Sequence, residues 1–130
     1  MATVPVVFLV EDDAAVRTAI SLLLKHFGFE ISTFDSAESF LKSYEETNSA
    51  CLVSDIRMPG MSGLDLLIAL KQQGSPLPVV LYSGYADSDI VTDAKKQGAL
   101  AVLAKAVGAD TLHAAVLEAL RSIPAEPVSD

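Results

Sequence analysis

The chain has 130 residues, the size of one domain, and its 51% hydrophobic content allows a sizeable core. A formal net charge of -8 argues against a duplex nucleic acid as a direct partner, because the phosphate backbone would be repelled. The single cysteine, Cys51, excludes an intramolecular disulfide, and no apolar run approaches the ~20 residues that a membrane span needs. We therefore expect a cytoplasmic domain that does not enter a membrane.

Short apolar runs alternate with longer stretches of helical spacing. The runs are too short for stable helices and suit buried strands, whereas the longer stretches carry one apolar stripe. In chain order the expected elements are strand Val6–Val10, helix Ala14–Phe27, strand Glu30–Phe34, helix Ala37–Glu46, strand Cys51–Ser54, helix Gly63–Gln73, strand Pro78–Tyr82, helix Ser88–Gln97, strand Leu100–Ala104 and helix Asp110–Ser122. Asp13 and Ser36 are predicted N-caps.

A strand–helix unit repeated five times predicts an α/β fold, a doubly wound (βα)5 three-layer sandwich around a parallel sheet. The common strand order for such a sheet is the flavodoxin-like 2-1-3-4-5, with the ligand site at the carboxyl ends of strands 1 and 3. We expect the domain to span residues 1–123 and residues 124–130 to form a flexible tail or the start of a linker.

Polar residues follow the predicted strands at the edge where such a site would lie. They are Glu11 and Asp12 after the first strand, Asp55 after the third, Ser83 after the fourth and Lys105 after the fifth. Three neighbouring carboxylates repel one another, and a hard cation such as Mg²⁺, which prefers oxygen ligands, relieves that repulsion. A hydroxyl and an ammonium group can bind phosphoryl oxygens. The pattern therefore favours a magnesium-dependent phosphoryl-transfer site with Asp55 as the nucleophile.

Three segments of the sequence carry a family resemblance: LVEDDAAVR at 9–17, LVSDIRMPGMSGLDLL at 52–67 and LYSGYAD at 81–87. They resemble the motifs of response regulator receiver domains of bacterial two-component signalling, including the chemotaxis receivers. The resemblance extends over about Val6 to Leu120, and the DIRMPGMSG segment is its most specific part.

The resemblance implies that Asp55 accepts a phosphoryl group from a histidine kinase or a histidine phosphotransfer protein. It implies a Mg²⁺ or Mn²⁺ ion held by Glu11, Asp12, Asp55 and the backbone carbonyl of Arg57, with Ser83 and Lys105 as further groups of the catalytic site. A receiver is not an enzyme in the ordinary sense, because it catalyses only its own phosphorylation and autodephosphorylation. Phosphorylation would then change partner binding, or homodimerisation through the predicted helix Ser88–Gln97, strand Leu100–Ala104 and helix Asp110–Ser122.

The resemblance also implies a switch and a set of residues that tune phosphoryl lifetime. Ser83 and Val102 occupy the switch positions, and Arg57 and Tyr85 occupy the lifetime-tuning positions. The sequence departs from the family at two of its usual residues. Val102 stands where an aromatic residue is common, and Ala106 stands where proline usually follows the lysine.

The sequence bears on three alternatives to a phosphorylated receiver. A nucleotide or flavin enzyme would need a glycine-rich phosphate loop, and neither G-x-x-x-x-G-K-[ST] nor G-x-G-x-x-G occurs in the sequence. An aspartate-dependent phosphohydrolase would need a D-x-D pair, but Asp55 is followed by Ile56 and Arg57. A degenerate receiver that acts as a phosphorylation-independent interaction module is the remaining alternative. Val102 and Ala106 leave it open, whereas the site residues argue against it, namely Glu11, Asp12, Asp55, Ser83 and Lys105.

Overall fold

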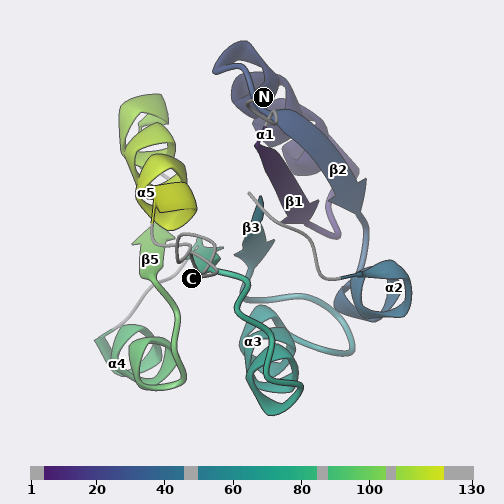
Figure 1. Cartoon of the computed structure of the whole chain (residues 1–130), viewed down its shortest axis with the longest axis vertical. Coiled ribbons are helices and arrows are strands. Elements are labelled where there is room, and N and C mark those ends of the chain that lie inside the picture. The colour runs from purple at the N-terminus through teal and green to yellow at the C-terminus, as the bar shows by residue number, and fades with distance from the viewer. Residues whose placement is uncertain (1–4, 46–49, 85–87, 105–107, 122–130) are drawn as a thin grey trace, which may run out of the picture.

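The computed structural model describes residues 5–45, 50–84, 88–104 and 108–121. Five strands form one parallel sheet in the order β2-β1-β3-β4-β5, which confirms the predicted topology (Figure 1). The elements are β1 (Val6–Val10), α1 (Ala14–His26), β2 (Glu30–Phe34), α2 (Ala37–Ser43), β3 (Ala50–Asp55), α3 (Gly63–Gln72), β4 (Val79–Ser83), α4 (Ser88–Lys96), β5 (Ala101–Ala104) and α5 (Ala109–Arg121). Among the described residues, no helix combines the length and the apolar character needed to cross a bilayer.

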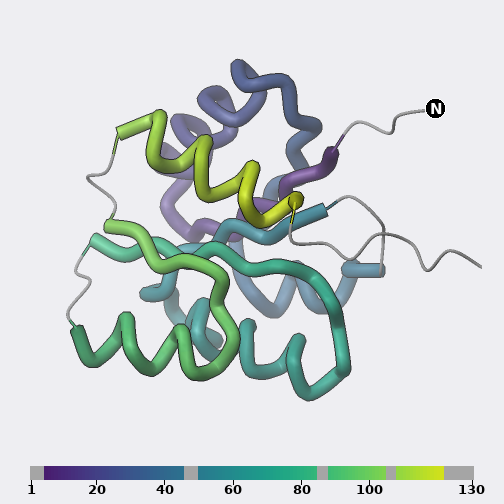
Figure 2. Tube along the Cα trace, turned by 60° about the vertical axis from the view of Figure 1, so that its left-hand side comes forward, coloured from purple at the N-terminus to yellow at the C-terminus, as the bar shows by residue number. Residues whose placement is uncertain are grey.

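Helices cover both faces of the sheet and enclose two hydrophobic cores. Figures 1 and 2 show α1 and α5 on one side of the sheet and α2, α3 and α4 on the other. The core beneath α2, α3 and α4 includes Phe40, Leu66 and Ala94, and the core beneath α1 and α5 includes Leu24 and Val116. All six residues of β3 are buried, so this central strand packs into both cores. Burial on both faces of the sheet explains why the strand sequences are nearly continuous apolar runs.

The predicted bounds differ from the observed ones by at most one residue, except at the end of α2. The prediction that this helix continues to Glu46 is wrong, because Tyr44 adopts an extended backbone with φ -69° and ψ 128°. Its ring stacks on Phe40 with a centroid separation of 5.0 Å and lies edge-on to Phe8. The Ser43 hydroxyl also donates to the Ser39 carbonyl oxygen, so side-chain packing and a local hydrogen bond end the helix there.

Side-chain caps begin α1 and α2 as the sequence predicts. The Asp13 carboxylate accepts a hydrogen bond from the Val16 amide, and the Ser36 hydroxyl accepts one from the Ser39 amide. Each cap satisfies one of the amides that the first turn of a helix leaves without a partner. The chain is thus turned sharply after β1, which keeps the residues between Val10 and Asp13 at the edge of the sheet.

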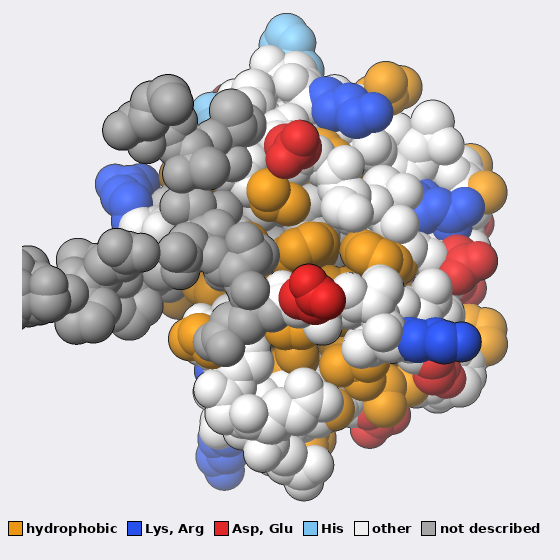
Figure 3. Space-filling view, turned by 45° about the vertical axis from the view of Figure 1, so that its right-hand side comes forward, with side chains coloured by type: hydrophobic (Ala, Val, Ile, Leu, Met, Phe, Trp, Pro, Cys, Tyr) orange, Lys and Arg blue, Asp and Glu red, His pale blue; other side chains and the backbone are white. Residues whose placement is uncertain are grey.

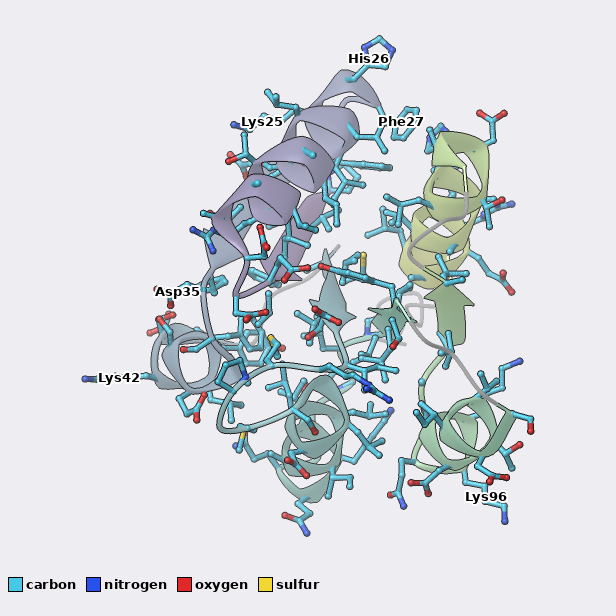
Figure 4. The ribbon with its side chains drawn as sticks, turned by 180° about the vertical axis from the view of Figure 1, so that it is seen from behind. Lys25, His26, Phe27, Asp35, Lys42 and Lys96 are labelled. Atoms are coloured by element: carbon cyan, nitrogen blue, oxygen red, sulfur yellow. The ribbon has the colours of Figure 1, made fainter. Side chains whose placement is uncertain are left out.

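The helices α1 and α5 are joined by an aromatic contact at one end. The ring of Phe27 stacks on His113 of α5, with centroids 4.0 Å apart and planes 3° from parallel. Figure 4 shows Phe27 facing α5, while Lys25 and His26 point away from the body of the molecule. On the face drawn in Figure 3, acidic and basic side chains are interspersed around hydrophobic ones, so this face carries no single-sign field.

Cys51 is buried in β3, as predicted from its strand position, and this has a measurable chemical consequence. Burial raises the pKa of its thiol to about 12, so the thiol stays protonated at pH 8 and the reactive thiolate is scarce. We expect native protein to resist alkylation by iodoacetamide at pH 8 and denatured protein to be alkylated rapidly. Equal rates by intact mass would contradict the buried position of this side chain.

Candidate functional site

The carboxyl ends of β1 and β3 bring three acidic side chains together. The carboxylate oxygens of Glu11, Asp12 and Asp55 lie within 4.8 Å of one another. Asp55 is the last residue of β3, and the ladder continues one residue further because the Ile56 amide donates to the Tyr82 carbonyl oxygen over 2.9 Å. Asp55 therefore lies on the strand itself, which ends one residue later than the predicted strand Cys51–Ser54. Ser83 is likewise the last residue of β4.

Glu11 and Asp55 are buried, whereas Asp12 is exposed. Glu11 has no solvent-exposed surface and Asp55 is 3% exposed. The Glu11 amide donates to the Phe34 carbonyl oxygen at 3.1 Å, and Arg17 donates to the Glu11 carbonyl oxygen at 2.8 Å, so its backbone is tied to β2 and α1. A buried carboxylate is stable only with hydrogen-bond donors or an opposite charge nearby, which makes its partners part of the site.

The Glu11 carboxylate itself accepts hydrogen bonds from Tyr82 and Asp13. The Tyr82 hydroxyl donates to Oε1 at 2.6 Å, and the Asp13 amide donates to Oε2 at 3.0 Å. Burial, together with the hydrogen bond to Glu11 and the charges of the acidic cluster, raises the pKa of the Tyr82 phenol well above its ordinary value. The phenol therefore stays protonated and acts as a donor. No sequence pattern assigns Tyr82 a role in the site, although its register partner on β3 is Asp55.

The loop that follows Asp55 is held in a fixed conformation. The Arg57 amide donates to Asp55 Oδ1 at 3.2 Å, and the Ser54 hydroxyl donates to the Asp55 carbonyl oxygen at 3.0 Å. The Gly63 amide then donates to the Ile56 carbonyl oxygen at 2.9 Å, which brings the start of α3 against the end of β3. A Cβ atom at Gly63 would collide with the Asp55 carbonyl oxygen, so only glycine fits there.

A side chain of α2 also contacts this loop, and the sequence does not predict the contact. The Glu38 carboxylate accepts a hydrogen bond from the Met61 amide at 3.1 Å and lies beside Gly60, whose φ is +75°. No pattern in the sequence pairs a residue of α2 with this loop, because the contact depends on how α2 packs against the neighbouring α3. The left-handed backbone at Gly60 is one that glycine adopts without strain.

The remaining predicted residues divide between described and undescribed parts of the chain. Ser83 is fully buried at the end of β4, and Arg57 is exposed two residues beyond Asp55. Val102 is partly buried on β5, pairs with Leu81 of β4 and packs against the core beneath α4. Lys105, Tyr85 and Ala106 lie outside the described residues, as does the predicted tail at 124–130.

The acidic cluster has the donor chemistry of a divalent-cation site. Its three carboxylates come from adjacent strands, and the Arg57 carbonyl is two residues from Asp55. Hard oxygen donors of this kind suit Mg²⁺, which keeps several waters when few protein ligands are offered. Glu11, Asp12 and Asp55 could therefore hold such an ion.

Doubly wound α/β domains commonly bind ligands at the topological switch point of the sheet, and in this chain the three acids lie at that edge. The family described as "Response regulator receiver domain" matches residues 7–117. The transcriptional regulatory protein FixJ of Bradyrhizobium diazoefficiens is 37% identical over 123 residues, covering 95% of this chain and 59% of that protein. The response regulator protein TodT of Pseudomonas putida is 35% identical over 119 residues, covering 92% and 52%.

Solved structures give the same result. A crystal structure of FixJ-N superimposes with a TM-score of 0.88 at 29% identity, covering 95% of this chain and 99% of that one. The response regulator StyR gives a TM-score of 0.85 at 37% identity, covering 93% and 61%. The chain belongs to the response regulator receiver domain family of two-component systems. It spans between half and three fifths of the length of FixJ and TodT.

Proposed function

We propose that this receiver accepts a phosphoryl group on Asp55 from a histidine kinase or a histidine phosphotransfer protein, in a reaction that requires Mg²⁺ or Mn²⁺. The observation that carries the proposal is the approach of the Glu11, Asp12 and Asp55 carboxylates to within 4.8 Å at the switch point of a receiver fold. Asp55 is the acid at the end of the central strand, and its Oδ1 is oriented by the Arg57 amide.

The chemical step is a displacement at phosphorus. A carboxylate oxygen of Asp55 forms a bond to phosphorus as the bond to the donor imidazole nitrogen breaks, and the imidazole leaves with the electron pair. A bound Mg²⁺ would supply charge neutralisation for the transferring oxygens. The Ser83 hydroxyl would donate to one phosphoryl oxygen, and Lys105 would pair with another by resemblance to the family. Water attack on the acyl phosphate would return Asp55 to its unphosphorylated form. Arg57 and Tyr85 would influence the lifetime of the acyl phosphate.

Phosphorylation would then alter an interaction surface. Ser83 and Val102 lie on adjacent strands β4 and β5, and the Ser83–Ala104 and Leu81–Val102 pairs hold those strands in register. A shift of Ser83 toward the phosphoryl group would therefore also displace β5. We propose that the surface formed by α4, β5 and α5 responds by changing partner binding or homodimerisation. By analogy with FixJ, the regulated output would be transcription.

Intact mass after incubation with acetyl phosphate and Mg²⁺ tests the central claim. Acetyl phosphate replaces the protein donor, and acetate leaves in place of imidazole. Gain of one phosphoryl group that chelator abolishes supports the proposal. No gain at short or long incubation would overturn it and favour a phosphorylation-independent interaction module, the alternative that Val102 and Ala106 suggest.

We expect Mg²⁺ to raise the melting temperature of the protein, because the cation relieves carboxylate repulsion in the folded state only. A ligand at about 100 times its dissociation constant adds about 2.7 kcal/mol to the free energy of unfolding. Asp12→Asn should reduce this shift, and it should raise the melting temperature of the metal-free form by removing a like charge. Differential scanning fluorimetry with and without Mg²⁺ measures both effects.

Asp13→Asn is the matched control for Asp12→Asn. It removes the same charge from the adjacent residue, lies outside the acidic cluster and retains a good N-cap for α1. The control should keep the wild-type Mg²⁺ shift. Equal shifts in all three proteins would show that Asp12 contributes nothing to cation binding.

A further inference from the structure

The Tyr82 side chain links two strands that are not neighbours. In the sheet β3 lies between β1 and β4, yet the hydroxyl of Tyr82 on β4 is 2.6 Å from the Glu11 carboxylate just beyond β1. The phenol therefore reaches across the end of β3, where Asp55 is its register partner. The same residue supports Asp55 through the backbone, because its carbonyl oxygen accepts the Ile56 amide.

The Glu11 carboxylate is restrained from two directions. Its Oε1 accepts from the Tyr82 hydroxyl, and its Oε2 accepts from the Asp13 amide at 3.0 Å. Rotation of this side chain would break both hydrogen bonds inside a site where Glu11 has no exposed surface. The Asp13 amide belongs to a turn fixed by the α1 cap, and the Tyr82 hydroxyl is a side-chain group that contributes to the orientation of the carboxylate.

The Tyr82 ring is itself held by packing that does not involve its hydroxyl. The side chain is 4% exposed and lines a cavity of about 250 Å³ between α1, β5 and α5, together with Val16, Ile20, Leu103 and Leu112. Tyr82 belongs to the hydrophobic core beneath α1 and α5 together with Leu112, against which Ile20 and Leu103 pack, so a phenylalanine would occupy the same position. Loss of the hydroxyl can therefore be separated from loss of the aromatic side chain.

We propose that Tyr82 is a positioning residue, whose hydroxyl fixes Glu11 in the orientation in which the acidic cluster takes up a divalent cation. This inference rests on the proposed cation-dependent function. Groups that orient the ligands of a metal site commonly change metal affinity by 10–100-fold when they are removed. Without the hydroxyl, Oε1 of Glu11 loses a hydrogen-bond donor. The Glu11 side chain would then have to become ordered when the cation binds.

The test is calorimetric titration of Mg²⁺ into metal-free wild type, Tyr82→Phe and Tyr44→Phe. Tyr44→Phe is the matched control, because it removes the same atom from a phenol that pairs with the Ser75 hydroxyl at 3.3 Å outside the acidic cluster. We expect Tyr82→Phe to bind Mg²⁺ about 10-fold more weakly and Tyr44→Phe to bind it as wild type does. Melting temperatures of the metal-free proteins establish that all three are folded.

Two further measurements separate positioning from a general structural effect. In the acetyl phosphate reaction, Tyr82→Phe should raise the half-saturating Mg²⁺ concentration while leaving the rate at saturating Mg²⁺ near that of wild type. In a Glu11→Ala background, adding Tyr82→Phe should leave the Mg²⁺ dissociation constant unchanged, because the hydroxyl acts through Glu11.

The outcomes distinguish this inference from the function on which it rests. If wild type binds Mg²⁺ and Tyr82→Phe binds it equally well or more tightly, the positioning role is overturned and the cation site stands. Weaker binding that persists in the Glu11→Ala background also overturns it, since the effect then bypasses Glu11. Absence of Mg²⁺ binding by wild type overturns both the cation site and the role of Tyr82.

Discussion

Asp55→Asn is expected to abolish phosphoryl uptake from acetyl phosphate, because an amide oxygen is a far poorer nucleophile than a carboxylate. The substitution preserves shape, and the asparagine oxygen can still accept the Arg57 amide at the 3.2 Å contact. It also removes one of three clustered negative charges, so the metal-free variant should melt at a temperature no lower than wild type. Lost uptake in a folded protein would thus report chemistry at Asp55.

Asp35→Asn is the control for this experiment. Asp35 follows β2 at the same edge of the sheet, is exposed and lies outside the acidic cluster (Figure 4). Its substitution should leave the gain of one phosphoryl group intact when both proteins are measured by intact mass. A phosphoryl group found on Asp55→Asn would contradict the assignment and direct peptide mapping to another acceptor.

Gly63→Ala is expected to destabilise the protein although alanine is ordinarily the better helix former. At the first position of α3, an added Cβ would strike the Asp55 carbonyl oxygen and approach the Asp55 carbonyl carbon and Ile56 Cα at 3.0 Å. All three atoms are backbone and belong to a strand end held by the Ile56–Tyr82 hydrogen bond. Overpacking of this kind costs about 1–3 kcal/mol.

Thermal and urea unfolding of Gly63→Ala would measure that loss. The displaced strand end should also slow phosphoryl uptake, because the collision occurs at Asp55 itself. Gly108→Ala is the control, since a Cβ there meets no atom within 4 Å and no left-handed backbone is required. Gly108 is the N-cap of α5, where alanine is less favourable than glycine, so Gly108→Ala should lower the stability by less than Gly63→Ala does. A Gly63→Ala protein as stable as wild type would contradict the close approach.

The fold and the acidic cluster were accessible from the sequence because each depends on a local pattern and a general rule. Apolar runs alternating with helical stretches predict a parallel sheet, and the switch-point rule then directs attention to the residues after β1 and β3. Glu11, Asp12 and Asp55 come together as that reasoning predicts. Their functional roles remain proposals, as do those of Ser83 and Lys105.

The contacts that hold the cluster were not accessible from the sequence. The Tyr82–Glu11 hydrogen bond spans an intervening strand, and the collision at Gly63 depends on the angle at which α3 leaves the loop. The early end of α2 likewise arises from the packing of Tyr44 against Phe8 and Phe40. Each feature is set by tertiary geometry, which overrides local propensity.

The complete burial of β3 affects the mobility of Asp55, the proposed acceptor. Local opening in proteins is most frequent where few apolar groups are buried, and the slowest-opening units are central core elements. Asp55 ends a strand whose six residues are all buried and which pairs with both β1 and β4. Fluctuations that expose loops would therefore leave the acceptor carboxylate anchored. An acyl phosphate formed there would decay at a rate set by water access and chemistry, and not by fraying of the strand that bears it.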